Sequence, residues 1–169
     1  MPTDTAAAIA HLRQAFTEKP TAARKPNAFA TATWTGGLRC EIAGPASERT
    51  VTDMPPALGG QGEGANPGWL MRASMASCAA TVIAMKAAMR GITLDTLQVR
   101  VDSESDSRGL VGIDGVSMAM DNLRMNVRIA AKGVDPAILR ELATAAATTS
   151  PVSATLCASP AIALDVTID

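Results

Sequence analysis

Apolar and polar residues alternate along three segments of the chain, a period that is typical of half-buried strands. Residues 97–106 keep Leu, Val and Val on one face and mostly acidic residues on the other, whereas residues 123–132 carry mainly basic residues on their polar face. Because opposite charges across an antiparallel pair stabilise it, we expect these two strands to be neighbours. The third alternating segment, residues 161–168, predicts a final strand.

Helical spacing of apolar residues, together with capping signals, predicts three further elements. A helix over residues 4–18 begins after Asp4, and a second over residues 136–148 begins after Asp135. Ser150 and Pro151 repeat the cap-plus-proline signal and predict a short helix through Cys157. The inward positions expected for the second helix are Ile138, Leu139, Leu142 and Ala145–Ala146.

The longest predicted helix covers residues 67–90 and has no polar face. Asn66 is a good N-cap, Pro67 suits the first helical position, and Gly91 is a natural residue after the last turn. A helix that is apolar on every side is expected to be buried on every side. We therefore expect a sheet to wrap it or a second copy of the chain to pack against it.

The segment before the long helix predicts a β-hairpin followed by a loop. Residues 28–35 and 38–42 read as strands joined at Gly36-Gly37, and residues 49–52 as a third strand. Residues 53–66 form a Pro- and Gly-rich loop of the length that is more often functional than idle, without the GK[ST] ending of a P-loop. This order of elements predicts an α+β protein.

Composition and charge narrow the function classes. The 169 residues are 47% apolar but only 2% aromatic, and the net charge is −1. Neither a basic face nor an aromatic stacking platform for nucleic acid is expected. The uncharged stretch at residues 73–85 is too short to span a bilayer, and no secretion signal is visible. The sequence thus predicts a soluble cytoplasmic protein without nucleic-acid or membrane partners.

Three cysteines, Cys40, Cys78 and Cys157, are the candidates for reactive chemistry. Their odd number and wide spacing do not predict a disulfide framework, and a single histidine, His11, leaves almost no ligands for zinc. Cys40 is expected to face the core. Cys78 lies in the apolar helix, where a thiolate is disfavoured, so a reactive Cys78 requires a basic residue from elsewhere.

The order of motifs resembles the OsmC/Ohr family. The match centres on LGGQGEGANPGWLMRASMASCAATVIAMKAAMRGI and is extended by RGLVGIDG and SPVSATL, so that it covers most of residues 28–169. Residues 1–27 then form an N-terminal helical extension. The resemblance implies curved antiparallel sheets wrapped around long central helices in an intertwined homodimer. It also implies a cofactor-free, thiol-dependent peroxidase that reduces organic hydroperoxides at the dimer interface and is recycled by an external thiol.

The site residues that the resemblance implies are only partly present. Cys78 matches the peroxidatic position, but Ser150 stands where the family has its second cysteine. The family's Glu follows the Asn-Pro of the loop, where this chain has Gly68, and its Arg follows the first Gly-Gly, where this chain has Leu38. The candidate substitutes are Glu63 and Arg39. Strand alternation would turn Arg39 to the face opposite Leu38 and Cys40 unless a bulge redirects it.

Three functions remain open at this level. The first is hydroperoxide reduction through Cys78, with Cys157, Cys40 or an external thiol resolving the oxidised form. The second is a binding protein that holds a small apolar ligand at the dimer interface, where Cys78 merely lines a pocket formed by Met71, Met75, Met85 and Met89. The third is redox sensing by Cys78 without peroxide turnover.

Overall fold

A computed structural model describes residues 4–168, which divide into two compact units. The first unit covers residues Met1–Ala73 and the second Ser74–Asp169, so the boundary falls within the long helix α2 (Pro67–Met89). Each unit is described by itself. The boundary expected between residues 27 and 28 stays a prediction.

The first unit begins with helical elements that bury no side chain. Helix α1 (Thr5–Glu18) starts where Asp4 accepts hydrogen bonds from the backbone N–H groups of Ala6 and Ala7, which confirms the predicted cap. A short 3₁₀ helix, η1 (Pro20–Ala23), follows. Leu12 and Phe16 remain exposed on α1.

The remainder of the first unit is a three-stranded antiparallel sheet in the order β1-β2-β3. Its strands are β1 (Thr31–Gly36), β2 (Arg39–Ala43) and β3 (Arg49–Thr52), so the hairpin and the third strand are confirmed, although β1 starts later than expected. Gly36 and Gly37 both have positive φ, which explains why a Gly-Gly pair forms the turn. A 3₁₀ helix, η2 (Pro56–Leu58), lies in the loop that leads to α2.

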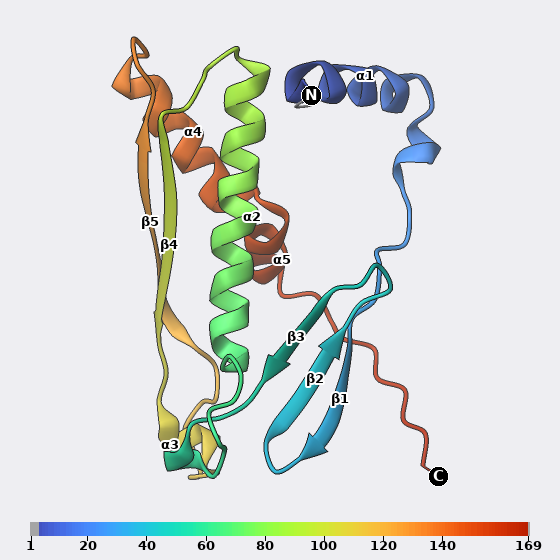
Figure 1. Cartoon of the computed structure of the whole chain (residues 1–169), viewed down its shortest axis with the longest axis vertical. Coiled ribbons are helices and arrows are strands. Elements are labelled where there is room, and N and C mark those ends of the chain that lie inside the picture. Colours follow the sequence, from blue (N-terminus) through green and yellow to red (C-terminus); the bar gives the residue numbers. More distant parts are fainter. Residues whose placement is uncertain (1–3, 169) are drawn as a thin grey trace. The chain divides into compact units, whose positions relative to one another are not determined.

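The second unit places the α2 residues from Ser74 onward beside a two-stranded antiparallel sheet of β4 (Thr96–Glu104) and β5 (Asp121–Ala130), as Figure 1 shows. Asp102 stands opposite Arg124, and Arg124 forms a 2.8 Å ion pair with Glu104. This confirms the pairing expected from the charges of the two strands. The other elements are the short helix α3 (Ser107–Leu110), α4 (Pro136–Thr149) and α5 (Pro151–Ala158).

The core of the second unit lies between α2, α4 and β5. Ala87 packs with Leu139 and Leu142, and Ile129 of β5 joins this cluster. Arg90, directly after α2, donates a 2.6 Å hydrogen bond to Glu141 of α4. This ion pair links the same two helices at the surface. Of the α4 residues expected to point inward, Leu139, Leu142 and Ala146 are buried, whereas the prediction for Ile138 was wrong, because it is 37% exposed.

Helix α2 buries one stripe within a single chain and leaves its other faces open. The buried stripe is Met75, Ala79, Ile83 and Ala87, spaced four residues apart, while Met85 and Met89 are exposed. The expectation of burial on every side is therefore not met by one chain alone. By length and composition α2 would also be able to cross a membrane. Core helices of soluble proteins meet the same two criteria.

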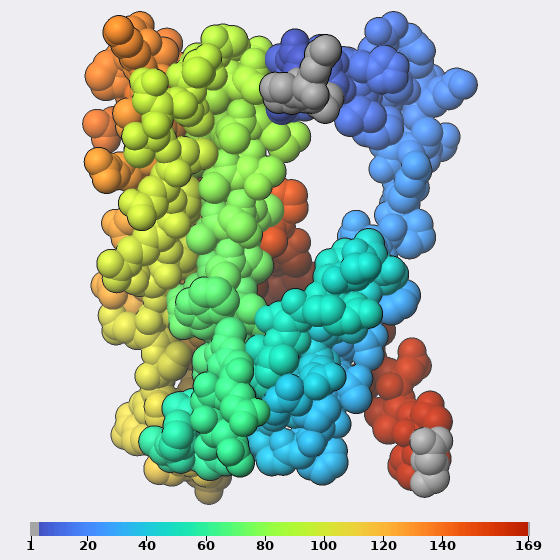
Figure 2. All heavy atoms as spheres, viewed as in Figure 1, coloured from blue at the N-terminus to red at the C-terminus, as the bar shows by residue number. Residues whose placement is uncertain are grey.

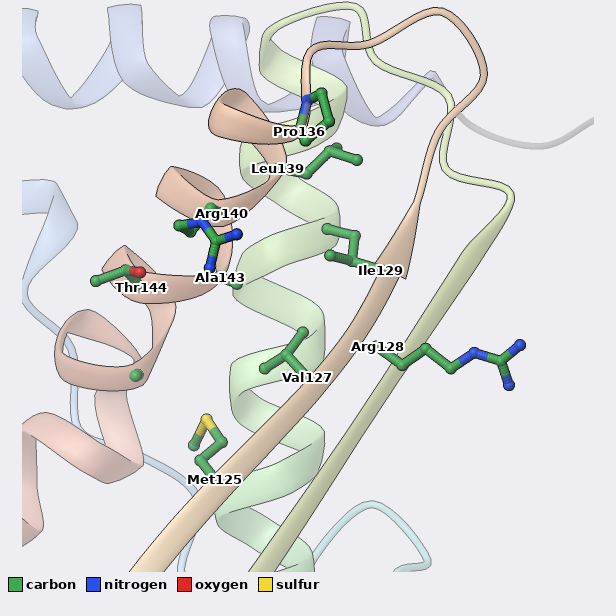
Figure 3. A pocket seen from close by; sticks show the side chains of 10 residues that line it. Met125, Val127, Arg128, Ile129, Pro136, Leu139, Arg140, Ala143 and Thr144 are labelled. Atoms are coloured by element: carbon green, nitrogen blue, oxygen red, sulfur yellow. The ribbon is translucent and has the colours of Figure 1, made fainter.

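A shallow groove of about 640 Å³ runs between β5 and α4. Figure 3 shows Met125, Val127 and Ile129 lining it from the strand, while Arg128 points away. Leu139 and Arg140 lie on the helix side. The groove contains none of the three cysteines.

The predicted final strand at residues 161–168 is wrong for the single chain, because the segment pairs with no sheet edge and has no regular structure. Figure 2 shows it, in red, as an arm that extends away from the yellow and orange residues of β4 and β5. Its alternating residues, expected on a core face, are instead exposed to between 70% and 91%; they are Ile162, Leu164, Val166 and Ile168. A strand pattern is realised only where another strand offers hydrogen bonds.

Candidate functional site

Cys78 is placed by the way α2 begins. The side chain of Asn66 accepts hydrogen bonds from the backbone N–H groups of Gly68 at 2.8 Å and Trp69 at 3.3 Å, as the sequence predicted. This cap fixes the helical phase, and Cys78 follows three turns later, in the second unit. The thiol is half-buried at the edge of the stripe that contains Met75 and Ala79.

The first hairpin contains an irregularity opposite Arg39. The pairing of β1 with β2 shifts register between Trp34 and Gly36, so that Cys40 stands opposite Trp34 and Arg39 opposite Gly36, with Thr35 as the extra residue. Such a bulge turns a strand locally and re-aims its side chains. The extra residue lies on β1, however, and Arg39 keeps the alternation of β2, because it contacts Glu41 two residues further along the same strand.

The Arg39 guanidinium lies among three oxygen groups, two of them carboxylates. Its Nη1 atom donates to the Thr35 hydroxyl at 2.7 Å and to Glu41 at 3.0 Å. Its Nε atom lies 3.4 Å from a carboxylate oxygen of Glu63. The Arg39 side chain is 30% exposed, so these contacts are partly shielded from water. The two substitutes expected from the sequence, Arg39 and Glu63, are thus in contact.

Asp53 holds the loop that carries Glu63. It follows β3 directly, is 2% exposed, and accepts backbone hydrogen bonds from Met54 at 2.7 Å, Gln61 at 2.9 Å and Glu63 at 3.2 Å. Burial by itself acts to raise the pKa of Asp53, but the N–H donors, joined by Gly62, lower the pKa below the ordinary 3.8. Sequence reasoning missed this residue, although an isolated Asp between a strand and a glycine-rich loop was a usable signal.

Acid is expected to remove the stabilisation that Asp53 provides. Because the folded-state pKa is depressed, this contribution is fully present above the ordinary value of 3.8 and is lost as the pH falls through the lower folded value. In urea unfolding, the difference in unfolding free energy between the wild type and Asp53→Asn should therefore shrink below that pH. A difference that stays constant with pH would contradict the assignment.

Ser150 occupies the position at which the family resemblance implies a second cysteine. Its side chain is fully buried and its hydroxyl donates to the Ser153 hydroxyl at 2.9 Å. Ser150 is the N-cap residue of α5, as expected, but its hydroxyl bonds to Ser153 and accepts no capping hydrogen bond from a backbone N–H. All three native cysteines are free: Cys157 is exposed, and Cys40, expected in the core, is half-buried.

The contact network of Arg39, Glu63 and Asp53 lies entirely within the first unit, and Cys78 belongs to the second. Among residues 4–168 no group of three or more His, Cys, Asp or Glu side chains could hold a metal ion. The chemistry that these residues can supply is that of a thiol in the second unit and a polar, charge-balanced network in the first.

Comparisons with known proteins identify the family and the fold. A family model described as "OsmC-like protein" matches residues 60–165, which is more than half of the chain and includes Glu63, Cys78 and Ser150. A search of curated proteins finds no significant match.

Solved structures reproduce the fold at low sequence identity. An OsmC-like protein from Mycoplasma pneumoniae superposes with a TM-score of 0.66 at 14% identity, covering 79% of this chain and 89% of that one. An organic hydroperoxide resistance protein OsmC from Legionella pneumophila gives 0.58 at 19% identity, with 79% and 90% covered. One from Elizabethkingia anophelis, also named an organic hydroperoxide resistance protein, gives 0.57 at 20% identity, with 78% and 89% covered. By its family match and its fold, the chain belongs to the OsmC-like protein family.

Proposed function

We propose that this protein is a thiol peroxidase that reduces organic hydroperoxides through Cys78. The observation that carries the proposal is the contact between Arg39 and Glu63. Two residues that stand at displaced sequence positions nevertheless meet, one on β2 and the other on a loop that Asp53 tethers. Relatives of the same fold that are named organic hydroperoxide resistance proteins support the substrate class.

The proposed reaction begins with the Cys78 thiolate. Its sulfur attacks one oxygen of the hydroperoxide, the O–O bond breaks, and the leaving alkoxide takes up a proton to become an alcohol. Cys78 is thereby oxidised by two electrons to a sulfenic acid. An external thiol then attacks that sulfur and releases water, and a second thiol reduces the mixed disulfide to restore Cys78. A reducing cytoplasm supplies such thiols.

Arg39 and Glu63 take the supporting roles in this proposal. A guanidinium brought beside Cys78 would favour the thiolate over the thiol, and its fork of N–H donors would suit the developing charge on the leaving oxygen. Glu63 holds the Nε side of Arg39, while Thr35 and Glu41 hold Nη1. These contacts at two of its nitrogen atoms restrict the orientation of the guanidinium.

We infer that the working form is a homodimer. The α2 helix is apolar, yet only 17% of its 18-residue apolar window is buried in one chain, and the 161–168 arm exposes a complete strand pattern. Exposed apolar surface of this extent indicates a partner. Light scattering should give twice 17.3 kDa for the full chain, and a chain that ends at Ser159 should lose that assembly. A monomeric full chain would overturn the inference.

Ser150→Cys is expected to convert recycling from an external to an internal thiol. By the family resemblance this position carries the resolving cysteine, and it lies in the same unit as Cys78. The change sacrifices the Ser150–Ser153 hydrogen bond, which costs about 1 kcal/mol of stability. After one equivalent of hydroperoxide, peptide mapping should find a disulfide between Cys78 and the introduced thiol. If Cys78 of the variant forms only mixed disulfides with added thiol, the placement of residue 150 relative to Cys78 differs from that in the family.

The proposed function is tested by following consumption of an organic hydroperoxide in the presence of a small dithiol. The protein should turn over many equivalents, and faster with an organic hydroperoxide than with hydrogen peroxide, because apolar residues flank Cys78. If the hydroperoxide is consumed no faster than by the dithiol alone, the peroxidase is excluded. The rival, binding of a small apolar ligand, would then be screened by thermal shift.

A further inference from the structure

Asp53 has an unusual position for a residue with no assigned role. It is 2% exposed, and both of its carboxylate oxygens are used: Oδ1 accepts from Met54, and Oδ2 accepts from Gln61 and Glu63. The three donors lie one, eight and ten residues along the chain. One side chain therefore gathers the whole loop between β3 and α2 around itself.

The loop backbone fits closely around this carboxylate. The backbone N–H of Asp53 donates to the carbonyl oxygen of Ala65, and that of Ala65 donates back to Val51, which closes the base of the loop. A Cβ atom added at Gly60 would collide with the carbonyl oxygen of Met54 and lie 2.8 Å from Oδ1 of Asp53. Such close contact leaves the loop little freedom while the carboxylate hydrogen bonds persist.

The same loop presents Glu63 to Arg39. The backbone N–H of Glu63 is held by Asp53 at 3.2 Å, and its carboxylate reaches the Nε atom of Arg39 at 3.4 Å. Glu63 itself is exposed, so packing does not fix where its side chain points. Its backbone is the part that is fixed, and Asp53 fixes it.

We propose that Asp53 is a positioning residue, which acts by holding the backbone of Glu63 so that the Glu63 carboxylate fixes the guanidinium of Arg39. Its influence on Cys78 rests on the proposed peroxidase function, whereas its influence on Arg39 does not. Asp53 touches neither Arg39 nor any reacting atom in this scheme. Its whole effect passes through Glu63.

A double-mutant cycle tests this dependence. Asp53→Asn keeps the shape of the side chain but replaces one acceptor oxygen by an N–H₂ donor, which must repel part of the N–H cluster. We expect Asp53→Asn and Glu63→Gln each to slow oxidation of Cys78 by an organic hydroperoxide about tenfold. The double variant should be no slower than Glu63→Gln alone. Effects that multiply would show that Asp53 acts independently of Glu63 and would overturn the proposal.

A spectroscopic measurement separates positioning from mere stabilisation of the loop. In ¹⁵N NMR the Nε–H resonance of Arg39 should shift in Asp53→Asn in the same direction as in Glu63→Gln. Glu41→Gln is the matched control, because Glu41 contacts Nη1 of Arg39 rather than Nε and makes no bond to Asp53. An Arg39 resonance that stays in place while the Gln61 and Glu63 amides exchange faster would show a purely structural role and overturn the proposal.

A second variant and the NMR comparison cover two further outcomes. If Asp53→Asn does not fold, Asp53→Glu serves instead, since it retains the charge but moves the oxygens, and the Arg39 resonance must again follow the loop amides. If wild-type Cys78 proves inert to hydroperoxide, the proposed function fails while the NMR comparison still decides the role of Asp53. If the wild type is active and the effects of Asp53→Asn and Glu63→Gln multiply, only the positioning role of Asp53 is overturned.

Discussion

Replacement of Cys78 by serine is expected to abolish hydroperoxide reduction, with a loss of about 10³-fold or more in kcat/KM. The reason is chemical: a serine hydroxyl is far less nucleophilic than a thiolate and cannot be carried through the sulfenic acid and disulfide states. Removal of a nucleophile leaves only the background reaction in other enzymes that use one. The measurement is initial hydroperoxide consumption with a dithiol reductant present in excess.

The matched controls are Cys40→Ser and Cys157→Ser. Cys40 lies on β2 in the first unit and Cys157 is exposed at the end of α5, and neither is assigned to the chemistry. Each control should retain activity within about twofold. Loss of activity in the Cys157 variant would identify Cys157 as the resolving thiol, which the proposed external route excludes. Full activity in Cys78→Ser would place the chemistry elsewhere in the molecule.

Substitution of Arg39 by glutamine should have the second largest effect, a fall of about 10²-fold in the rate of Cys78 oxidation. Glutamine removes the positive charge and the fork of donors that the proposal assigns to the thiolate and the leaving oxygen. It also leaves the carboxylates of Glu41 and Glu63 without their counter-charge. The rate is followed by stopped flow with an organic hydroperoxide.

Two variants show whether the Arg39 effect is specific. Arg49 lies on the neighbouring strand β3 and bonds to the backbone carbonyls of Gly44 and Glu48, so Arg49→Gln removes an arginine from the same sheet without touching the network. It should react at the wild-type rate. Arg39→Lys keeps the charge but loses the fork and should fall between the two. Equal effects of Arg39→Gln and Arg49→Gln would show that Arg39 acts only through its positive charge and not through its specific contacts.

Much of the fold was predictable because its signals are local. The caps at Asp4, Asn66 and Asp135 act within a few residues and marked the starts of three helices correctly. The β4–β5 pairing was predictable from complementary charges on two alternating segments. These features depend on neighbours in the sequence or on a simple pairing rule.

The rest depended on contacts between distant residues. The 161–168 segment has the pattern of a strand, but pattern alone does not supply a partner edge, and within one chain it stays unpaired. Ile138 and Leu142 both lie on the apolar side of α4, and only the packing against α2 decides which is buried. Helical periodicity identifies a broad face and not the centre of the contact.

The candidate site residues divide in the same way, into those that local sequence suggests and those that depend on distant contacts. Cys78 was proposed from its sequence context, and its role stays a prediction; Arg39 and Glu63 were proposed only as displaced substitutes, and the structure shows that these two are in contact. The register shift opposite Arg39, with Thr35 as the extra residue, is a feature that no strand-period argument locates in advance, and the aim of Arg39 at Cys78 stays a prediction. Asp53 was missed because its function is to accept backbone N–H groups up to ten residues away, which leaves no periodic mark in the sequence.

The most direct test of the central claim is the fate of Cys78 itself. The reduced protein with Cys40→Ser and Cys157→Ser contains one thiol, and it is mixed with one equivalent of an organic hydroperoxide without any reductant. Peptide mass spectrometry should then find one added oxygen on Cys78, trapped by a sulfenic-acid reagent, with the corresponding alcohol formed in equal amount. If Cys78 remains a free thiol while the hydroperoxide persists, Cys78 is not a peroxidatic cysteine and the account is wrong.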